Sequence, residues 1–359
     1  MIQQRLDRLI VCMKEHNLDQ VLITEDLNLF YYTGSYEQSM ERLRVLLVGR
    51  DGSCRYYANE LFPSAGLCEF TFSHRDGAEL SALGDLAIHL RPGARVAVDR
   101  MWSAGYLLSL LPLAPHCTFV SAEAVLSAPM ACKDSRELAL MCQSSQINDQ
   151  VVGELISSIG ESATETGLCN DIHSLYSRYG ADGFAGGAMV AFGAKCAAAH
   201  PQPHPVHPQI GDSILIDAGA PYRFYQSDMT RTVFFRDVSR EMERIYNVVL
   251  EANLAGIDAV RPGRPAHEVD AACRAVIEKN GYGPYFTHRT GHGIGLQLHE
   301  APSISPHSDT VLQEGMVFSI EPGIYIPTAG GVRIEDLVAV TSNGVQVLNR
   351  LPKGLTVLY

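Results

Sequence analysis

Short apolar runs alternate with segments of helical periodicity over the first third of the chain. The apolar residues of 1–19 recur at helical spacing with charged residues between them, which is typical of an amphipathic helix. Residues 44–59 contain two apolar runs around a turn at 50–52, which predicts a β-hairpin. The other elements expected here are a strand that runs into a loop (20–34), a short strand (94–99) and two helices (79–90 and 103–113). This order of elements predicts a compact α/β domain.

A change of pattern within residues 125–135 predicts a domain boundary. A long helical stretch, 136–160, follows this segment, and either Asp134 or Ser135 can serve as its N-cap. Because 359 residues are too many for one ordinary core, we expect two domains, 1–128 and 129–359. Further helices are expected at 165–178 and 267–279.

The C-terminal part contains a weak internal repeat. In each copy a helix is followed by histidines and then by a strand that a glycine opens. A carboxylate lies six residues after that glycine, at Asp217 and at Glu321, and a second one follows on a later strand, at Asp228 and at Glu335. A duplicated unit of helices and a hairpin folds naturally about a pseudo-twofold axis, which would bring the carboxylates together.

Asp217 and Glu321 are the most informative of these carboxylates because each lies inside an apolar strand. The residues ILI precede Asp217, and VFSI precede Glu321. An acidic side chain is costly to bury in such a strand unless it is paired or binds a metal. The alternative is that the acids cap strands or face solvent, and the apolar neighbours argue against it.

Histidines lie among glycines in residues 287–300. His292 is flanked by Gly291 and Gly293, so we expect the backbone to approach a bound group closely there. His292 and His299 are seven residues apart, so a turn must intervene if both side chains reach one site.

The chain resembles metallopeptidase family M24, which has the pita-bread fold and includes methionine aminopeptidase, aminopeptidase P and prolidase. The matching segments are IDAGA, SDMTRT, GHGIGLQLHE, FSIEPGIYI and GVRIED, and they occur in the family's order. The N-terminal part is similar to the smaller domain of aminopeptidase P, prolidase and creatinase. The resemblance implies an α+β fold, in which a pita-bread C-terminal domain with a pseudo-twofold repeat follows a smaller α/β domain of the creatinase type.

The resemblance also implies two divalent metal ions held by five residues. Asp217 would bind one metal, His292 and Glu321 would bind the other, and Asp228 and Glu335 would bridge them. Without metal the carboxylates would repel one another and take up protons. An oxygen-rich site with one nitrogen donor and no thiolate favours manganese or cobalt, with iron or zinc as alternatives.

The roles of the remaining site residues follow from the same resemblance. A hydroxide that bridges the metals would attack the scissile carbonyl, and Glu321 would move its proton to the leaving amine. His299 and His200 would contact the substrate, with His200 placed by its spacing before the IDAGA strand.

Three further residues match positions close to the active site of the family. Arg333 lies two residues before Glu335, so a strand would put both on one face, where Arg333 could orient the metal carboxylates or meet a substrate carboxylate. His288 and Tyr325 match positions in enzymes like aminopeptidase P and are expected to bind substrate.

We therefore expect an exopeptidase for Xaa-Pro bonds, in particular an Xaa-Pro dipeptidase (prolidase), since the domain layout and compact length resemble short microbial prolidases. An Xaa-Pro aminopeptidase acting on longer peptides is one alternative. A metal-dependent hydrolase of a small metabolite that contains a C–N bond is another. A non-enzymatic binding protein is disfavoured because no ligand position departs from the family's pattern.

Composition narrows the class of partner. The net charge of −12 disfavours nucleic acid and anionic membranes. The nine cysteines are scattered and form no C-x-x-C pair, which indicates free thiols in a reducing compartment. No apolar run reaches the ~18 residues that a membrane span needs. We expect a cytoplasmic protein that acts on small proline-containing peptides and, by analogy with relatives, forms a homodimer.

Overall fold

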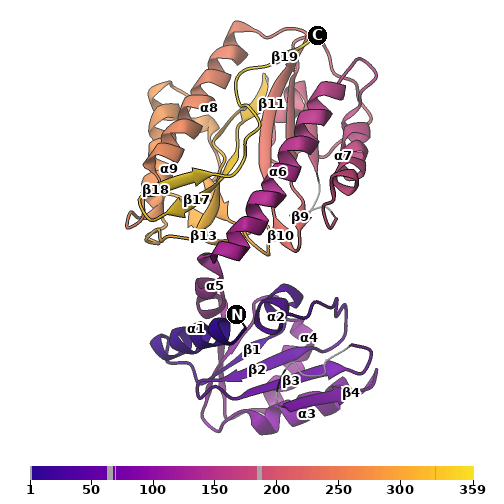
Figure 1. Ribbon diagram of the computed structural model, residues 1–359, viewed down its shortest axis with the longest axis vertical. Helices are drawn as coiled ribbons and strands as arrows, with labels where there is room; N and C mark the ends of the chain where they lie inside the picture. The colour runs from indigo at the N-terminus through magenta and orange to yellow at the C-terminus, as the bar shows by residue number, and fades with distance from the viewer. Residues whose placement is uncertain (1, 63–67, 69, 184–187, 328) are drawn as a thin grey trace. The chain divides into compact units, whose positions relative to one another are not determined.

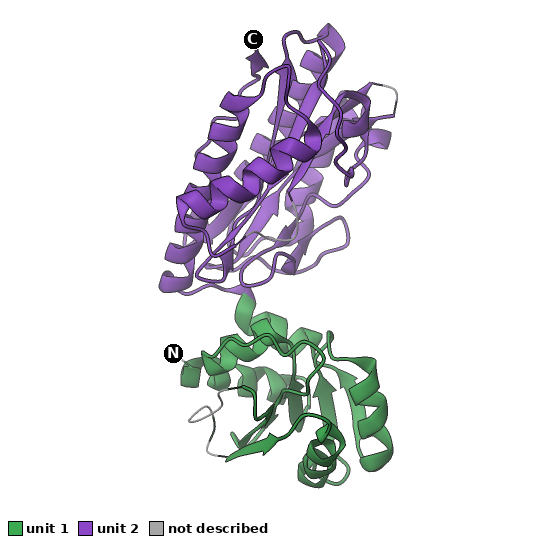
Figure 2. Ribbon diagram, turned by 90° about the vertical axis from the view of Figure 1, so that its right-hand side faces the viewer, with its two compact units in different colours: residues 1–130 green, residues 131–359 purple. Residues whose placement is uncertain are grey.

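The computed structural model describes residues 2–62, 68, 70–183, 188–327 and 329–359. The chain divides into two compact units, unit 1 (residues 1–130) and unit 2 (residues 131–359), which Figure 2 colours separately. Every helix among the described residues is too short or too polar to span a lipid bilayer.

Unit 1 is built on a six-stranded mixed sheet with the strand order β4-β3-β2-β1-β5-β6. The central strands β1, β2 and β3 are antiparallel neighbours, whereas the outer strands join them in parallel. Its elements are α1 (Ile2–Glu15), β1 (Gln20–Ile23), α2 (Asp26–Thr33), β2 (Val45–Gly49), β3 (Cys54–Asn59), β4 (Phe70–His74), α3 (Glu79–His89), β5 (Arg95–Val98), α4 (Ala104–Leu110), η1 (Leu111–Leu113), β6 (Thr118–Ser121) and α5 (Glu123–Ala131).

The predicted hairpin of unit 1 is confirmed, but the predicted loop after the first strand is wrong. β2 and β3 pair antiparallel around a turn at Gly52, which has a φ of +88°. The segment expected to be a loop instead forms α2, which ends at Gly34 in the left-handed conformation. Leu29 and Tyr32 of this helix are buried, so tertiary packing outweighs the weak helix propensity of its aromatic residues.

Unit 2 consists of two halves of similar architecture (Figure 1). Each half has a pair of helices and then two antiparallel strands that flank a small two-stranded ribbon. The first half contains α6 (Ser135–Ser158), α7 (Glu165–Tyr179), β7 (Met189–Phe192), η2 (Gly193–Ala197), β8 (Ser213–Ala218), β9 (Pro221–Tyr222), β10 (Tyr225–Gln226) and β11 (Met229–Phe235). The second half contains α8 (Arg240–Ala259), α9 (Ala266–Lys279), η3 (Gly283–Tyr285), β12 (Gly291–Gly293), β13 (Glu300–Ile304), β14 (Val317–Ile320), β15 (Gly323–Ile326), β16 (Gly330–Arg333), β17 (Asp336–Thr341) and β18 (Gly344–Val347), and β19 (Val357–Leu358) returns to pair with β11.

The predicted repeat and the predicted helices of unit 2 match this arrangement. α6 begins after Asp134, which forms a capping box with Glu137. Apolar side chains of α6 and α7 pack on β7, β8 and β11, and those of α8 and α9 pack on β14 and β17. Gly211 and Gly315, which precede the two carboxylate strands, both adopt a positive φ. This backbone conformation is strained in a residue that has a side chain.

A buried asparagine links the helices of each half to its carboxylate strand. The Asn148 side chain of α6 donates to the carbonyl of Ala218, one residue after Asp217, at 2.7 Å. The Asn253 side chain of α8 donates to the carbonyl of Ile320, one residue before Glu321, at 2.9 Å. These bonds fix the strand ends from which the carboxylates project.

Removing the asparagine link of the second half should destabilise unit 2. In Asn253→Ala, the carbonyls of Ile320 and Ile334 lose a buried donor, so the free energy of unfolding should fall by about 2 kcal/mol. Asn247 lies exposed on the same helix, and Asn247→Ala should stay within about 0.5 kcal/mol of the wild type. Chemical denaturation measures both, and equal stability of the two variants would contradict this role for Asn253.

Candidate active site

The carboxylates of both halves converge on one cavity of about 440 Å³ in unit 2. The strand pairs bring them together, because Asp217 lies in β8, Asp228 immediately precedes β11, Glu321 immediately follows β14 and Glu335 immediately precedes β17. Every residue that the sequence places at the site lines this cavity except Tyr325. The lining site residues are His200, Asp217, Asp228, His288, His292, His299, Glu321, Arg333 and Glu335.

Ligand-type atoms are closest around His292. One atom each from Asp228, His292 and Glu335 lie within 4.8 Å of one another, and all three side chains are buried. The Nε2 atom of His292 is 3.4 Å from a Glu321 oxygen and 3.8 Å from an Asp228 oxygen. The Oε1 atom of Glu335 is buried with no hydrogen-bond partner among the described residues.

Burial and mutual repulsion change the proton affinity of these groups. Burial raises the pKa of Asp228 and of Glu335 well above ordinary carboxyl values, and the neighbouring carboxylates raise both further. Burial likewise raises the pKa of Glu321 to about 7. Burial lowers the pKa of His292 to about 3, so its imidazole is neutral and can act as a ligand.

Arg333 supplies the main positive charge inside the carboxylate cluster. Its Nη2 atom donates to Asp217 at 2.5 Å, and its Nε atom donates to the hydroxyl of Thr230 at 3.0 Å. Thr230 in turn donates to Glu335 at 2.7 Å. The guanidinium is buried, so these bonds hold one carboxylate of each half in a fixed orientation.

The expectation that Arg333 and Glu335 share one strand is wrong. β16 ends at Arg333, and β17 begins only after Glu335. The backbone of Glu335 turns aside to donate to the carbonyl of Thr230 at 3.1 Å. Both side chains still meet at the Thr230 hydroxyl, so the cross-strand partner rather than strand alternation brings them together.

Tyr325 connects Arg333 to His288 at the edge of the cluster. The Nη1 atom of Arg333 donates to the Tyr325 hydroxyl at 3.1 Å, and Nε2 of His288 lies 2.8 Å from the same oxygen. Burial lowers the pKa of His288 to about 4, so this imidazole is neutral. Tyr325 is therefore a buried link in this network, and His288 presents its ring to the cavity.

His299 and His200 lie on the more exposed side of the cavity. A turn separates β12 from β13, as the spacing of the histidines requires, and it places the His299 ring 4.3 Å from the His292 ring between centroids. Burial lowers the pKa of His299, and the positive charge of Arg289 lowers it further. His200 follows η2 in the first half.

The glycines beside His292 leave room for the backbone of neighbouring strands. A Cβ atom on Gly291 would lie 1.9 Å from the carbonyl oxygen of Ser319, and one on Gly293 would lie 2.1 Å from that of Ala301. These glycines therefore allow the neighbouring strands β14 and β13 to pack against β12.

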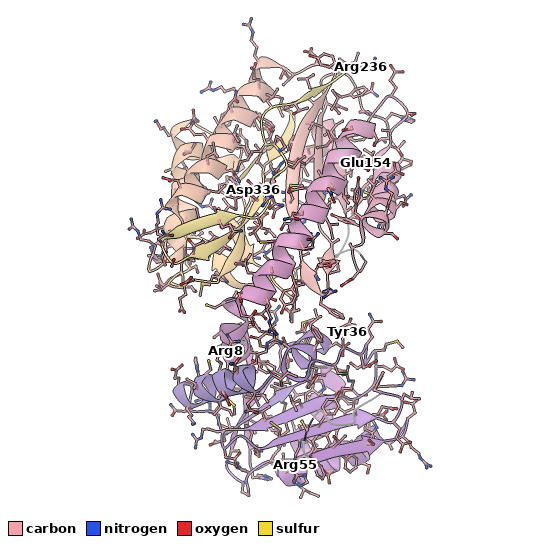
Figure 3. The ribbon with its side chains drawn as sticks, viewed as in Figure 1. Arg8, Tyr36, Arg55, Glu154, Arg236 and Asp336 are labelled. Atoms are coloured by element: carbon pink, nitrogen blue, oxygen red, sulfur yellow. The ribbon has the colours of Figure 1, made fainter. Side chains whose placement is uncertain are left out.

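A second group of charged side chains supports the backbone next to the site residues. Asp336, labelled in Figure 3, adjoins Glu335 and accepts hydrogen bonds from Arg231 at 2.8 Å and from Lys353 at 2.5 Å. Arg231 also donates to the carbonyl of Glu335 at 2.6 Å. The two cations neutralise a buried carboxylate that directly follows a site residue in the chain.

Sequence reasoning missed Thr230, Ser319 and Arg289. Thr230 could have been found, because it lies two residues after Asp228 and so shares its face of the strand. Ser319 lies two residues before Glu321, so the same spacing could have found it; it donates to Glu321 at 3.1 Å and accepts from the His292 backbone at 3.0 Å. Arg289 lines the cavity as an exposed cation beside His288.

Comparisons with known proteins agree with this fold. The pattern of metallopeptidase family M24 matches residues 139–342, and that of the creatinase/prolidase N-terminal domain matches residues 5–128. A Bacillus subtilis (strain 168) protein named "Putative dipeptidase YkvY" is 34% identical, with 99% of each chain covered.

Solved structures of similar proteins superpose over the whole chain. A recombinant prolidase from Thermococcus sibiricus has a TM-score of 0.94 at 30% identity and covers 100% of this chain and 99% of its own. An Xaa-Pro dipeptidase from Bacillus anthracis has a TM-score of 0.91 at 29% identity, with 100% of both chains covered. The predicted family and fold are therefore confirmed. The chain belongs to metallopeptidase family M24, a family of metal-dependent peptidases, and its N-terminal part is a creatinase/prolidase N-terminal domain.

Proposed function

We propose that the protein is a metal-dependent Xaa-Pro dipeptidase. The observation that carries this proposal is a single cavity that holds four carboxylates, one buried imidazole and an exposed arginine. The names of the similar solved structures, a prolidase and an Xaa-Pro dipeptidase, support the substrate class. Proline lacks an amide hydrogen and has a fixed φ, so a dedicated peptidase is needed for the bond before it.

The donor set fits divalent metal ions. The orphaned Oε1 of Glu335 and the raised pKa values of Asp228 and Glu335 all indicate a site that lacks compensating positive charge. We propose Asp217, Asp228, His292, Glu321 and Glu335 as the residues that hold two ions. Carboxylate oxygens with one nitrogen favour manganese or cobalt, with iron or zinc as alternatives. When bound, the ions would supply an activated water as the nucleophile and polarise the scissile carbonyl.

Glu321 is suited to carry the proton of the reaction. The leaving nitrogen of proline becomes a secondary amine and must receive one proton when the bond breaks. We propose that the Glu321 carboxylate accepts a proton from the attacking water and releases it to that nitrogen. Ser319 holds the Glu321 carboxylate by a 3.1 Å hydrogen bond, which fixes its orientation.

His299 and His200 are placed to stabilise the oxyanion that forms at the scissile carbonyl. Both line the cavity on its more exposed side, where a substrate enters. Because the pKa of His299 is lowered, its imidazole is neutral at physiological pH and donates through a single N–H group. A preorganised donor of this kind stabilises developing negative charge without reorganisation.

The position of Arg289 in the cavity favours dipeptides over longer peptides as substrates. Arg333 is already committed, because its nitrogens donate to Thr230, Asp217, Tyr325 and the Ala199 carbonyl. Arg289 is exposed in the same cavity, and among the described residues its side chain donates only to the Ser303 hydroxyl, at 3.3 Å. A dipeptide places its terminal carboxylate one residue beyond the scissile bond, where this guanidinium can bind it.

Removal of the proposed metal ligands should abolish metal binding and activity together. Asp228→Asn and Glu335→Gln each remove a buried anionic donor, so metal content and hydrolysis of Ala-Pro should both fall by at least about 100-fold. Elemental analysis after chelation and readdition of Mn²⁺ measures the first, and proline release measures the second. Glu314→Gln, an exposed acid of unit 2, is the control. Variants with full metal content and turnover would refute the assignment.

The metal-free protein should lose stability as the pH rises from 5 to 7.5. The folded-state pKa of Glu321 is about 7 against an ordinary value of 4.5, so the folded protein retains a proton that the unfolded chain releases in this window. The resulting loss in the free energy of unfolding is absent at low pH and grows as the pH rises. Thermal unfolding in chelator should therefore show the Tm of the wild type falling by roughly 5 °C relative to Glu321→Gln. A constant difference between the two proteins would contradict this account.

Arg289 should determine the preference for a free carboxylate. Arg289→Ala should lower kcat/KM for Ala-Pro by about 10- to 100-fold through KM, while hydrolysis of Ala-Pro amide, which lacks the negative charge, stays nearly unchanged. Arg264→Ala, an exposed arginine of unit 2 outside the cavity, is the matched control. A wild type that prefers longer Xaa-Pro peptides would instead identify an aminopeptidase.

A further inference from the structure

One wall of the catalytic cavity is a proline-rich stretch, residues 199–204, which we call the His200 segment. It contributes Ala199, His200, Pro201, Gln202 and Pro203 to the cavity lining. The imidazole of His200 is exposed, and no hydrogen bond fixes it within the part of the chain that the structure describes. Its position in the cavity therefore depends on how the backbone of the His200 segment is held.

The backbone of the His200 segment is anchored at both ends. Arg333 donates to the carbonyl of Ala199 at 3.1 Å, which ties the first end to the carboxylate cluster. Lys195 donates to the carbonyl of Gln202 at 2.8 Å, and the backbone N–H of His204 donates to a Glu165 oxygen at 2.7 Å. The second end is thus fastened to the first turn of α7.

Glu165 is the centre of this second anchor. Its side chain is fully buried, and its carboxylate accepts from the N–H of Phe192 at 2.8 Å, from the N–H of His204 and from the ammonium of Lys195. These partners come from the end of β7, from η2 and from the His200 segment. A buried carboxylate costs free energy unless its hydrogen bonds form. The end of β7, η2 and the His200 segment are therefore held in one fixed arrangement around it.

The position of Glu165 at the start of a helix further stabilises its buried carboxylate. It is the first residue of α7, where the partial positive charge of a helix N-terminus stabilises a carboxylate. Neither Glu165 nor Lys195 lines the cavity, so neither can contact a substrate there directly. An effect of these residues on turnover must therefore act through the segments that they hold, and the His200 segment is the one that carries a proposed substrate-contacting residue.

We propose that Glu165 and Lys195 are positioning residues that set the place of His200 at the catalytic cavity. This inference rests on the proposed function to the extent that His200 contacts the reacting carbonyl. If the two residues had only a structural role, substituting either one would lower the stability of unit 2 as a whole. A positioning pair affects the His200 segment and the chemical step that depends on it, while the metal ligands stay in place.

The test is a double-mutant cycle between Glu165 and His200 in the metal-loaded enzyme. Glu165→Gln keeps the side-chain volume but removes the charge that binds Lys195, and it should lower kcat/KM for Ala-Pro about 10-fold with unchanged metal content. In the His200→Ala background the same substitution should change kcat/KM less than about twofold. Glu161→Gln removes an exposed acid that pairs with Arg236 and should have no effect in either background.

Hydrogen exchange tests the anchor without reference to activity. The amides of His204 and Phe192, which both donate to Glu165, should exchange at least about 10-fold faster in Glu165→Gln and in Lys195→Met, whereas those of β11 should not change. Unchanged exchange in the His200 segment would overturn the proposal, and so would equal losses of kcat/KM in the two backgrounds. If His200→Ala alone had no effect, the positioning role would fail while dipeptidase activity stood. Absence of Xaa-Pro hydrolysis in the wild type would refute the proposed function alone.

Discussion

Repulsion among four carboxylates in one buried cavity is the constraint that shapes unit 2. Asp217, Asp228, Glu321 and Glu335 come from two strand pairs, and the fold must hold them together against their own charge. It does so with rigid supports: Asn148 and Asn253 fix the strand ends, and Arg333 with Thr230 joins Asp217 to Glu335. These supports do not balance the negative charge of the four carboxylates, and this makes the cavity suited to divalent cations.

The two halves of unit 2 share an architecture but not their chemistry. Each half supplies two carboxylates from equivalent strands, yet His292, His299 and His288 all come from the second half, and His200 comes from the first. The repeat therefore builds the anionic centre, and the departures from the repeat build the surface that a substrate meets. Such a division lets substrate preference change through loops while the carboxylate frame stays fixed.

The sequence predicts much of this site because Asp217 and Glu321 stand out as acids within apolar strands, and the repeat then leads to Asp228 and Glu335. The helix α2 was missed because its aromatic residues obscure a helical pattern that burial stabilises. Glu165 resembles any acid in a first helical turn, and its partners lie 27 to 39 residues away. The site roles, the metal identity, the homodimer and the cytoplasmic location stay predictions.

The pairing of Arg333 with Asp217 spans 116 residues, and that of Thr230 with Glu335 spans 105. Contacts this distant along the chain form late, since a long loop must close before either is gained. A growing polypeptide that contains only the first half therefore lacks the Arg333 partner of Asp217 and the Glu335 partner of Thr230. The complete set of four carboxylates, and the raised proton affinities that depend on it, forms only when the second half docks.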